Sequence, residues 1–112
     1  HPKAAIRAIH QAGGVAILAH PGRRYTELVP LFAMIKEITR FGIDGIEVFS
    51  PRHSPQQIKA LTRFGEKNNL ILTGGSDYHG KINQPELTLG CGGIDEKYFR
   101  NFQRALTKGS RF

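Results

Sequence analysis

The chain has 112 residues, of which 39% are hydrophobic and 22% charged, an ordinary composition for one globular domain. No apolar run approaches the roughly 20 residues needed to cross a membrane, and no signal-peptide pattern opens the sequence, so we expect no membrane contact. The 16 Lys and Arg outnumber the 9 Asp and Glu, and the formal charge of +7 favours anionic partners such as phosphorylated metabolites or nucleic acid. Cys91 is the only cysteine, so no internal disulfide can form and we expect a cytoplasmic protein.

The first part of the chain predicts two helices with one strand between them. Apolar residues recur at helical spacing over residues 2–12, and a glycine follows. Residues 14–19 are rich in β-forming side chains and lead into His20, so they predict a strand that ends in a loop. A second helix is expected after Thr26, and Gly42 ends it.

The second part predicts two more strands, each with a helix after it. Residues 45–49 form an apolar β-type run. Ser54 then starts a third helix as its N-cap, and Gln57 completes a capping-box pattern. Residues 70–73 are a short apolar run between Asn and Gly residues, which is typical of a buried parallel strand. A last helix is expected over about residues 95–107.

The end of the chain leaves two interpretations open. Residues 87–89 predict a short strand before the last helix. One face of that helix is apolar, and its other face is basic along its length, with Lys97, Arg100, Arg104, Lys108 and Arg111. Such a face is either ordinary solvated surface or a patch that binds nucleic acid or a partner protein.

The alternation of helices and strands predicts an α/β fold. We expect about three or four mostly parallel strands with flanking helices and right-handed crossovers. So few strands cannot close a standard (β/α) barrel, which favours a fragment, and we expect a single domain over residues 1–112. The chain begins at His1 without an initiator methionine, which suggests a piece of a longer protein, although a cleaved tag would look similar. Exposed strand edges in such a piece predict dimerisation.

Residues of the metal-ligand type follow two of the predicted strands. Asp77 and His79 come just after residues 70–73, and an extended chain would project both side chains to the same side. His20 follows the strand over residues 14–19. Because ligands bind at the carboxyl ends of parallel strands, we expect these side chains to share one cavity. A carboxylate and two imidazoles suit zinc, manganese or iron, which activate water for phosphoryl chemistry.

Three motifs together resemble a known family. They are GGVAILAHPGRRY at residues 13–25, DGIEV at residues 44–48 and GSDYHG at residues 75–80. In this order they resemble the carboxyl-terminal half of a PHP domain, the polymerase and histidinol phosphatase superfamily of metal-dependent phosphoesterases. The likeness is to its small bacterial members that degrade RNA from the 5′ end or hydrolyse 3′,5′-nucleoside bisphosphates. It implies the carboxyl-terminal portion of a distorted (β/α)7 barrel that holds two or three divalent metals at its strand ends.

The resemblance also implies roles for single residues. His20 looks like the ligand to the second metal, Asp77 like a ligand to the first and His79 like a ligand to the third, which makes them the candidate catalytic residues. Arg24 looks like the arginine that meets the substrate phosphate, while the role of its neighbour Arg23 stays open.

Three further polar residues have more than one interpretation. His53 comes soon after the strand over residues 45–49, so it either faces the same cavity and touches substrate or is an ordinary polar loop residue. Glu47 and Asp44 are candidates for orienting a ligand histidine, although Glu47 would equally suit the capping of a loop.

The sequence departs from the family in its missing amino-terminal ligands. Nothing here supplies the family's opening His-x-His pair, its bridging acid or its further histidines, and we interpret His1 and His10 as surface or tag residues. We therefore expect metal-dependent hydrolysis of phosphate esters in the longer parent protein and little or no activity in this chain alone. The alternative is a noncatalytic module that binds nucleic acid or protein through the basic last helix.

Overall fold

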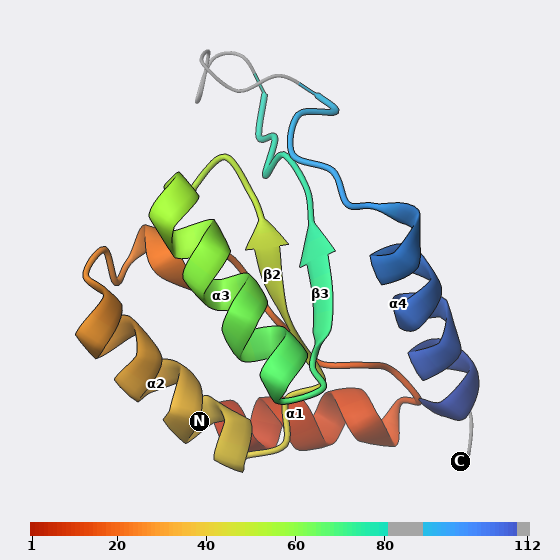
Figure 1. The fold of residues 1–112 in the computed structure, drawn as a ribbon. Helices are drawn as coiled ribbons and strands as arrows, with labels where there is room; N and C mark the ends of the chain where they lie inside the picture. Colours follow the sequence, from red (N-terminus) through yellow and green to blue (C-terminus); the bar gives the residue numbers. More distant parts are fainter. Residues whose placement is uncertain (81–88, 110–112) are drawn as a thin grey trace.

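The computed structural model describes residues 1–80 and 89–109, and its centre is a parallel sheet (Figure 1). The strands are β1 (Ile17–Leu18), β2 (Gly45–Phe49) and β3 (Ile71–Gly74), arranged in the order β1-β2-β3. The predicted α/β class with parallel strands is confirmed. The short strand expected over residues 87–89 lies largely outside the described residues.

Helices connect the strands and flank the sheet. They are α1 (Pro2–Gln11), α2 (Leu28–Arg40), α3 (Pro55–Lys67) and α4 (Glu96–Gly109), and a short 3-10 turn, η1 (Pro21–Arg23), follows β1. The predicted capping box of α3 is present, because Ser54 Oγ accepts from the Gln57 N–H at 3.1 Å and Gln57 Oε1 accepts from the Ser54 N–H at 2.8 Å. Each predicted helix agrees with an observed one to within about two residues.

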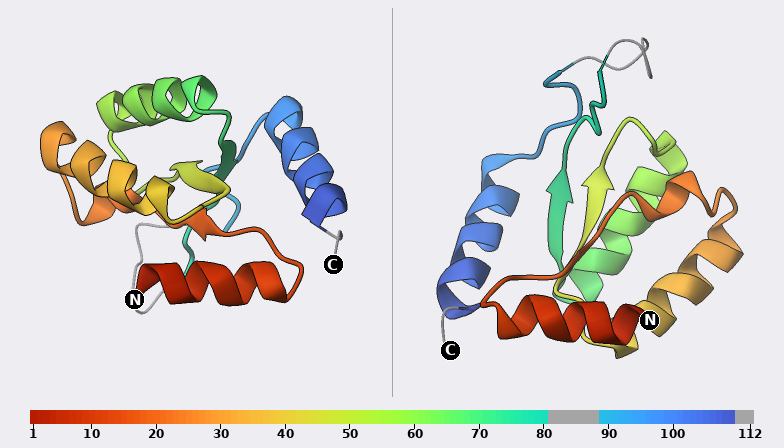
Figure 2. Two further views of the ribbon diagram at one scale, coloured as in Figure 1. Left: turned by 90° about the horizontal axis from the view of Figure 1, so that it is seen from below. Right: turned by 180° about the vertical axis from the view of Figure 1, so that it is seen from behind.

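The main core lies between the sheet and two of the helices. Figure 2 shows α2 and α3 on one side of the sheet, α1 on the other side near the amino ends of the strands, and α4 beside β3. The largest fully buried side chains are Leu31, Ile35, Ile46, Val48, Leu61 and Leu72. Side chains alternate along a strand, so Ile46 and Val48 face one side and Glu47 between them faces the other. This alternation leaves Glu47 available to the site described below.

Strand β1 is shorter than predicted because Asp44 takes a backbone partner from it. The Ala16 N–H donates to Asp44 Oδ2 at 2.6 Å, and the same oxygen lies 2.7 Å from His10 Nε2. Asp44 stands just before β2, at the amino end of the sheet, so the expectation that it orients a ligand histidine was wrong. His10 keeps 36% of its side chain exposed, as expected of a surface residue, and it also joins α1 to this corner. His1, by contrast, is exposed and accepts a hydrogen bond from the Lys3 N–H.

The periphery of the fold bears on two of the predictions. Over the described ranges, no helix is both long and apolar enough to span a membrane. Among the described residues, no strand pairs with the outer edge of β1. The outer edge of β3 lies beside α4. The basic face of α4 is described up to Lys108, and Arg111 lies outside the described residues.

Candidate metal and phosphate site

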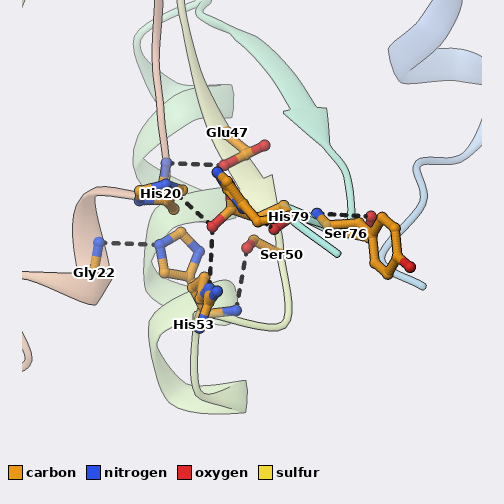
Figure 3. A network of polar contacts seen from close by, with 10 residues as sticks. His20, Gly22, Glu47, Ser50, His53, Ser76 and His79 are labelled. Atoms are coloured by element: carbon orange, nitrogen blue, oxygen red, sulfur yellow. Dashed lines mark hydrogen bonds and ion pairs between the residues drawn. The ribbon is translucent and has the colours of Figure 1, made fainter. Parts of the chain in front are cut away.

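The loops that follow the three strands meet at one end of the sheet. Parallel strands place all their carboxyl ends together, so the segments after β1, β2 and β3 become neighbours. Figure 3 shows His20 from the first of these loops, His53 from the second and His79 from the third. The predicted convergence of these segments is therefore observed.

The carboxylate of Asp77 is the centre of this cluster. Its Oδ2 lies 3.6 Å from His20 Nε2 and 3.1 Å from Arg52 Nε, and its Oδ1 lies 3.6 Å from His79 Nδ1. Only 14% of the Asp77 side chain is exposed, whereas His79 is 58% exposed and stands at the rim. The structure thus brings together the three predicted ligands and adds Arg52, which the sequence reasoning did not single out.

The backbone reaches this geometry by a route that differs from the expected one. Asp77 has φ of 54°, in the left-handed region, so the extended chain that would project Asp77 and His79 to the same side is not what brings them together. His79 Nδ1 lies 2.6 Å from the carbonyl oxygen of Asp77. His20 also has a positive φ, of 20°. Sparsely populated backbone conformations are characteristic of functional sites, and here they occur at two of the proposed ligands.

The donor types at Asp77 suit a transition metal, but their number falls short. One carboxylate and two imidazoles are ligands that zinc, manganese and iron accept. Among the described residues, however, no three His, Cys, Asp or Glu side chains form a group that could hold an ion, and Arg52 contacts one oxygen of Asp77. The described residues therefore supply part of a coordination sphere and would need further ligands to complete it.

Glu47 holds the backbone of the first proposed ligand. Its Oε1 accepts from the His20 N–H at 2.9 Å (Figure 3). Glu47 thus caps the loop after β1, and the same hydrogen bond fixes the backbone position of His20. Because it reaches the backbone, Glu47 leaves both ring nitrogens of His20 available for other partners.

Two buried side chains fix Gly22 in the loop after β1. His53, 7% exposed, accepts from the Gly22 N–H through Nε2 at 3.0 Å, and its Nδ1 lies 2.8 Å from the Val48 carbonyl oxygen. Gln57 donates to the Gly22 carbonyl oxygen at 3.0 Å. Both ring nitrogens of His53 are therefore engaged by backbone atoms, which places it as a positioning residue of the loop rather than a substrate contact. We call Gly22, His53 and Gln57 the loop latch.

Three arginines lie close to His20 or Asp77 at this end of the sheet. Arg23 and Arg24 are exposed on and just after η1, and both line a cavity of about 560 Å³ together with His20. Arg52 lies in the loop after β2, and 15% of its side chain is exposed. Its backbone N–H donates to Ser50 Oγ at 3.1 Å. The signal that could have identified Arg52 is its place, a cation directly after the carboxyl end of a parallel strand.

Comparisons with known proteins relate the chain to enzymes that act on phosphate esters. No protein-family model matches the chain. The chain is 34% identical over 80 residues to a phosphoribosyl 1,2-cyclic phosphate 1,2-diphosphodiesterase of Eggerthella lenta, a match to 71% of the chain and 29% of that protein. It is 33% identical over 75 residues to the 5′-3′ exoribonuclease Rnm of Escherichia coli, covering 67% and 26% of the two chains. A 3′,5′-nucleoside bisphosphate phosphatase of Chromobacterium violaceum is 34% identical over 68 residues, a match to 61% of this chain and 24% of that protein.

A solved structure matches more of the chain than these sequences do. The crystal structure of a proposed metal-dependent phosphoesterase from Bifidobacterium adolescentis aligns with a TM-score of 0.76 and 30% identity, over 93% of this chain and 36% of that one. The chain spans between about a quarter and about a third of the length of these relatives. In sequence and in fold, the chain is a partial match to the PHP-domain metal-dependent phosphoesterases.

Proposed function

We propose that this chain forms one wall of the active centre of a metal-dependent phosphoesterase. It would be a single domain over residues 1–112, the carboxyl-terminal portion of a PHP barrel. The observation that carries the proposal is the approach of His20, Arg52 and His79 to the Asp77 carboxylate at the carboxyl ends of three parallel strands. Imidazole, carboxylate and guanidinium groups in one place suit a phosphate ester held beside a cation.

Each residue has a distinct role in this proposal. His20, Asp77 and His79 would hold divalent zinc, manganese or iron, two or three ions in the complete protein, and the bound ions would supply a Lewis acid and an activated water. Glu47 keeps the His20 backbone in place. Arg24, which lines the same cavity as His20, would pair with the phosphate oxygens.

The substrate class follows from the relatives and from charge. The three relatives named above act on a cyclic ribose phosphate, on RNA and on nucleoside bisphosphates. The net charge of +7 attracts such anions. We propose nucleotides, nucleoside bisphosphates or RNA 5′ ends as substrates and the cytoplasm as the location. Because the described donors are few, we propose that the chain alone hydrolyses these substrates poorly or not at all.

Metal binding and hydrolysis together test this function. We expect zinc or manganese to bind the 112-residue chain weakly in calorimetry, Asp77→Ala to abolish that binding, and Glu37→Ala, an exposed acid on α2, to leave it unchanged. Hydrolysis of adenosine 3′,5′-bisphosphate and 5′-phosphorylated RNA should appear only when the chain is extended toward the amino terminus. An extended protein that stays metal-free and inert would contradict the proposal, and strong hydrolysis by the short chain would contradict its inactivity.

A second candidate function has its own supporting observation. Lys97, Arg104 and Lys108 of α4 line a cavity of about 460 Å³ against β3, on the opposite side of β3 from β2. This basic cavity supports a noncatalytic module that binds nucleic acid or an acidic partner. Binding of that kind should weaken steeply with salt and survive a chelator, whereas the metal-dependent function should be lost with the chelator.

A further inference from the structure

Four basic side chains of α4 form a line on the exposed side of the helix. They are Lys97, Arg100, Arg104 and Lys108, and all four are exposed. At about 100° per residue they lie within roughly a quarter turn of the helix, and Lys97 and Lys108 are roughly 16 Å apart along its axis. We call this line the basic ridge.

The basic ridge stands between two cavities. One has a volume of about 460 Å³ and lies against β3, and the other has a volume of about 350 Å³. Lys97, Asn101 and Arg104 line both of them. The cationic groups are therefore accessible from both sides of the ridge.

The acidic residues beside the basic ridge leave most of its charge unpaired. Two acids line these cavities, and each already accepts a hydrogen bond within the fold. Glu96 accepts from Arg100 at 2.7 Å, and Glu66 accepts from the Tyr98 hydroxyl at 2.8 Å. The other three residues of the ridge form no ion pair with any described residue. Several exposed cations in a row favour a ligand with regularly spaced anionic groups.

The basic ridge begins at the end of the sheet that carries the candidate site. The segment before α4 packs against the carboxyl ends of β2 and β3: a Cβ at Gly92 would lie 2.7 Å from the Gly75 carbonyl oxygen, and a Cβ at Gly74 would lie 3.0 Å from Ile94 Cγ2. Helix α4 starts two residues after Ile94 and runs back along β3 toward the amino end of the strand (Figure 1). The ridge thus leads away from the end of the sheet where Asp77 lies.

We propose that the basic ridge binds the sugar–phosphate backbone of a nucleic-acid strand whose 5′ phosphate lies at the Asp77 carboxylate. This inference rests on the proposed function, and it makes nucleic-acid binding a part of that function instead of an alternative to it. At about 3.4 Å per nucleotide, the ridge spans about five nucleotides. The aromatic ring that lines the larger cavity, Tyr98, is only 8% exposed, so the contacts are with phosphates and read no base sequence. The preferred ligand is therefore a nucleic-acid end and not a free nucleotide.

Binding measured in the presence of a chelator tests the ridge apart from catalysis. The experiment is fluorescence anisotropy on the 112-residue chain in EDTA, with a 5′-phosphorylated RNA decamer and a 5′-phosphorylated dinucleotide. We expect the decamer to bind at least about tenfold more tightly than the dinucleotide. Four phosphate contacts predict a slope of about −3 when the logarithm of the decamer affinity is plotted against the logarithm of the salt concentration. A decamer that binds no more tightly than the dinucleotide would overturn the inference.

Charge-matched variants separate the ridge from general attraction to a basic protein. Lys97→Gln with Arg104→Gln removes two exposed charges from the ridge, and Lys59→Gln with Arg63→Gln removes two exposed charges from α3. We expect the ridge variant to lose at least about tenfold in decamer affinity and about 1.4 of the salt slope, whereas the α3 variant keeps most of both. Equal losses in the two variants would overturn the inference. Decaglutamate that binds as tightly as the decamer would assign the ridge to acidic proteins and would overturn it as well.

Failure of this inference and failure of the proposed function give different results. If the extended protein hydrolyses 5′-phosphorylated RNA while the ridge variant binds the decamer normally, only the inference is wrong. If the ridge variant loses decamer binding while the extended protein stays metal-free and inert, the ridge stands as a nucleic-acid surface and only the proposed function is wrong.

Discussion

At the residue scale, Gly22 shows why a glycine stands in the loop that carries His20. Its N–H and carbonyl oxygen are both hydrogen-bonded to buried side chains, His53 and Gln57. A Cβ at this position would lie 2.6 Å from His53 Cδ2 and 2.7 Å from Gln57 Nε2. The hydrogen bonds hold the loop so closely against the latch that no side chain fits between them.

We therefore expect Gly22→Ala to destabilise the chain by about 1–3 kcal/mol, because the methyl group would push the latch apart. The measurement is urea denaturation followed by circular dichroism. The control is Gly93→Ala, where a Cβ would have no neighbour within 4 Å and the change should stay within about 1 kcal/mol. Similar free energies of unfolding for the two variants would show that the latch is loose.

At the element scale, Tyr98 attaches α4 to the rest of the fold. It is 8% exposed, its hydroxyl donates to Glu66 Oε1 of α3 at 2.8 Å, and its ring lies 5.3 Å from the ring of Phe49 in β2. Burial, and next the hydrogen bond to Glu66, raise the pKa of Tyr98 above its ordinary value of 10.0. A single side chain of α4 thus contacts both α3 and β2.

Replacing this residue should loosen α4 in two steps. Tyr98→Phe keeps the ring and loses the hydrogen bond, so we expect a loss of about 1 kcal/mol, whereas Tyr98→Ala should cost about 3 kcal/mol or more. Phe99→Ala, whose side chain is 49% exposed, is the control on the same helix and should cost less. Chemical denaturation of the three variants measures these free energies, and an equal loss for Phe99→Ala would contradict the anchoring role.

Tyr98 also makes the stability of the fold depend on pH. A tyrosine pKa raised on folding contributes stability that is fully present below pH 10.0 and is lost as the pH rises through the folded value. Spectrophotometric titration should therefore show a phenol that ionises above pH 10.0, and this phase should vanish in Tyr98→Phe.

The helices were predictable from the sequence because their signals are local. The Ser54 capping box fixed the start of α3, and apolar spacing located the others. The length of β1 was not predictable, because the Asp44 carboxylate takes the Ala16 N–H from a distant part of the chain. The position of Asp44 before β2, however, already indicated the amino end of the sheet, far from the site.

The candidate site was predictable to the level of loops and not to that of side-chain contacts. That segments bearing His20, Asp77 and His79 converge follows from parallel strands alone. The contacts of Arg52 with Asp77 and of His53 with Gly22 depend on how two loops pack against each other, which no local pattern encodes. Sequence reasoning therefore left His53 open between a substrate contact and an ordinary loop residue, and it passed over Arg52.

At the scale of the whole molecule, the sheet has an outer edge at β1 that no described strand covers. Unpaired backbone groups on such an edge favour pairing with a second copy. We expect the 112-residue chain to show concentration-dependent dimerisation in sedimentation velocity, and Ile17→Lys to weaken it by placing a charge in β1. Ile9→Lys, a partly exposed position on α1, is the control. A strict monomer at high concentration would contradict this prediction.

The parallel register has a consequence for how the chain acquires its structure. Gly45 pairs with Ile71 in a unit that contains β2, α3 and β3, and this unit buries Ile46, Leu61 and Leu72. The chain loses conformational entropy when residues so far apart in sequence come together, before their contacts stabilise the pair. Closing the loop between β2 and β3 should therefore limit the rate of folding. During synthesis this central unit can form once β3 has left the ribosome, whereas β1, made before β2, gains its sheet partner only when β2 is in place. Within these 112 residues, folding should therefore begin in the unit of β2, α3 and β3 and reach β1 afterwards.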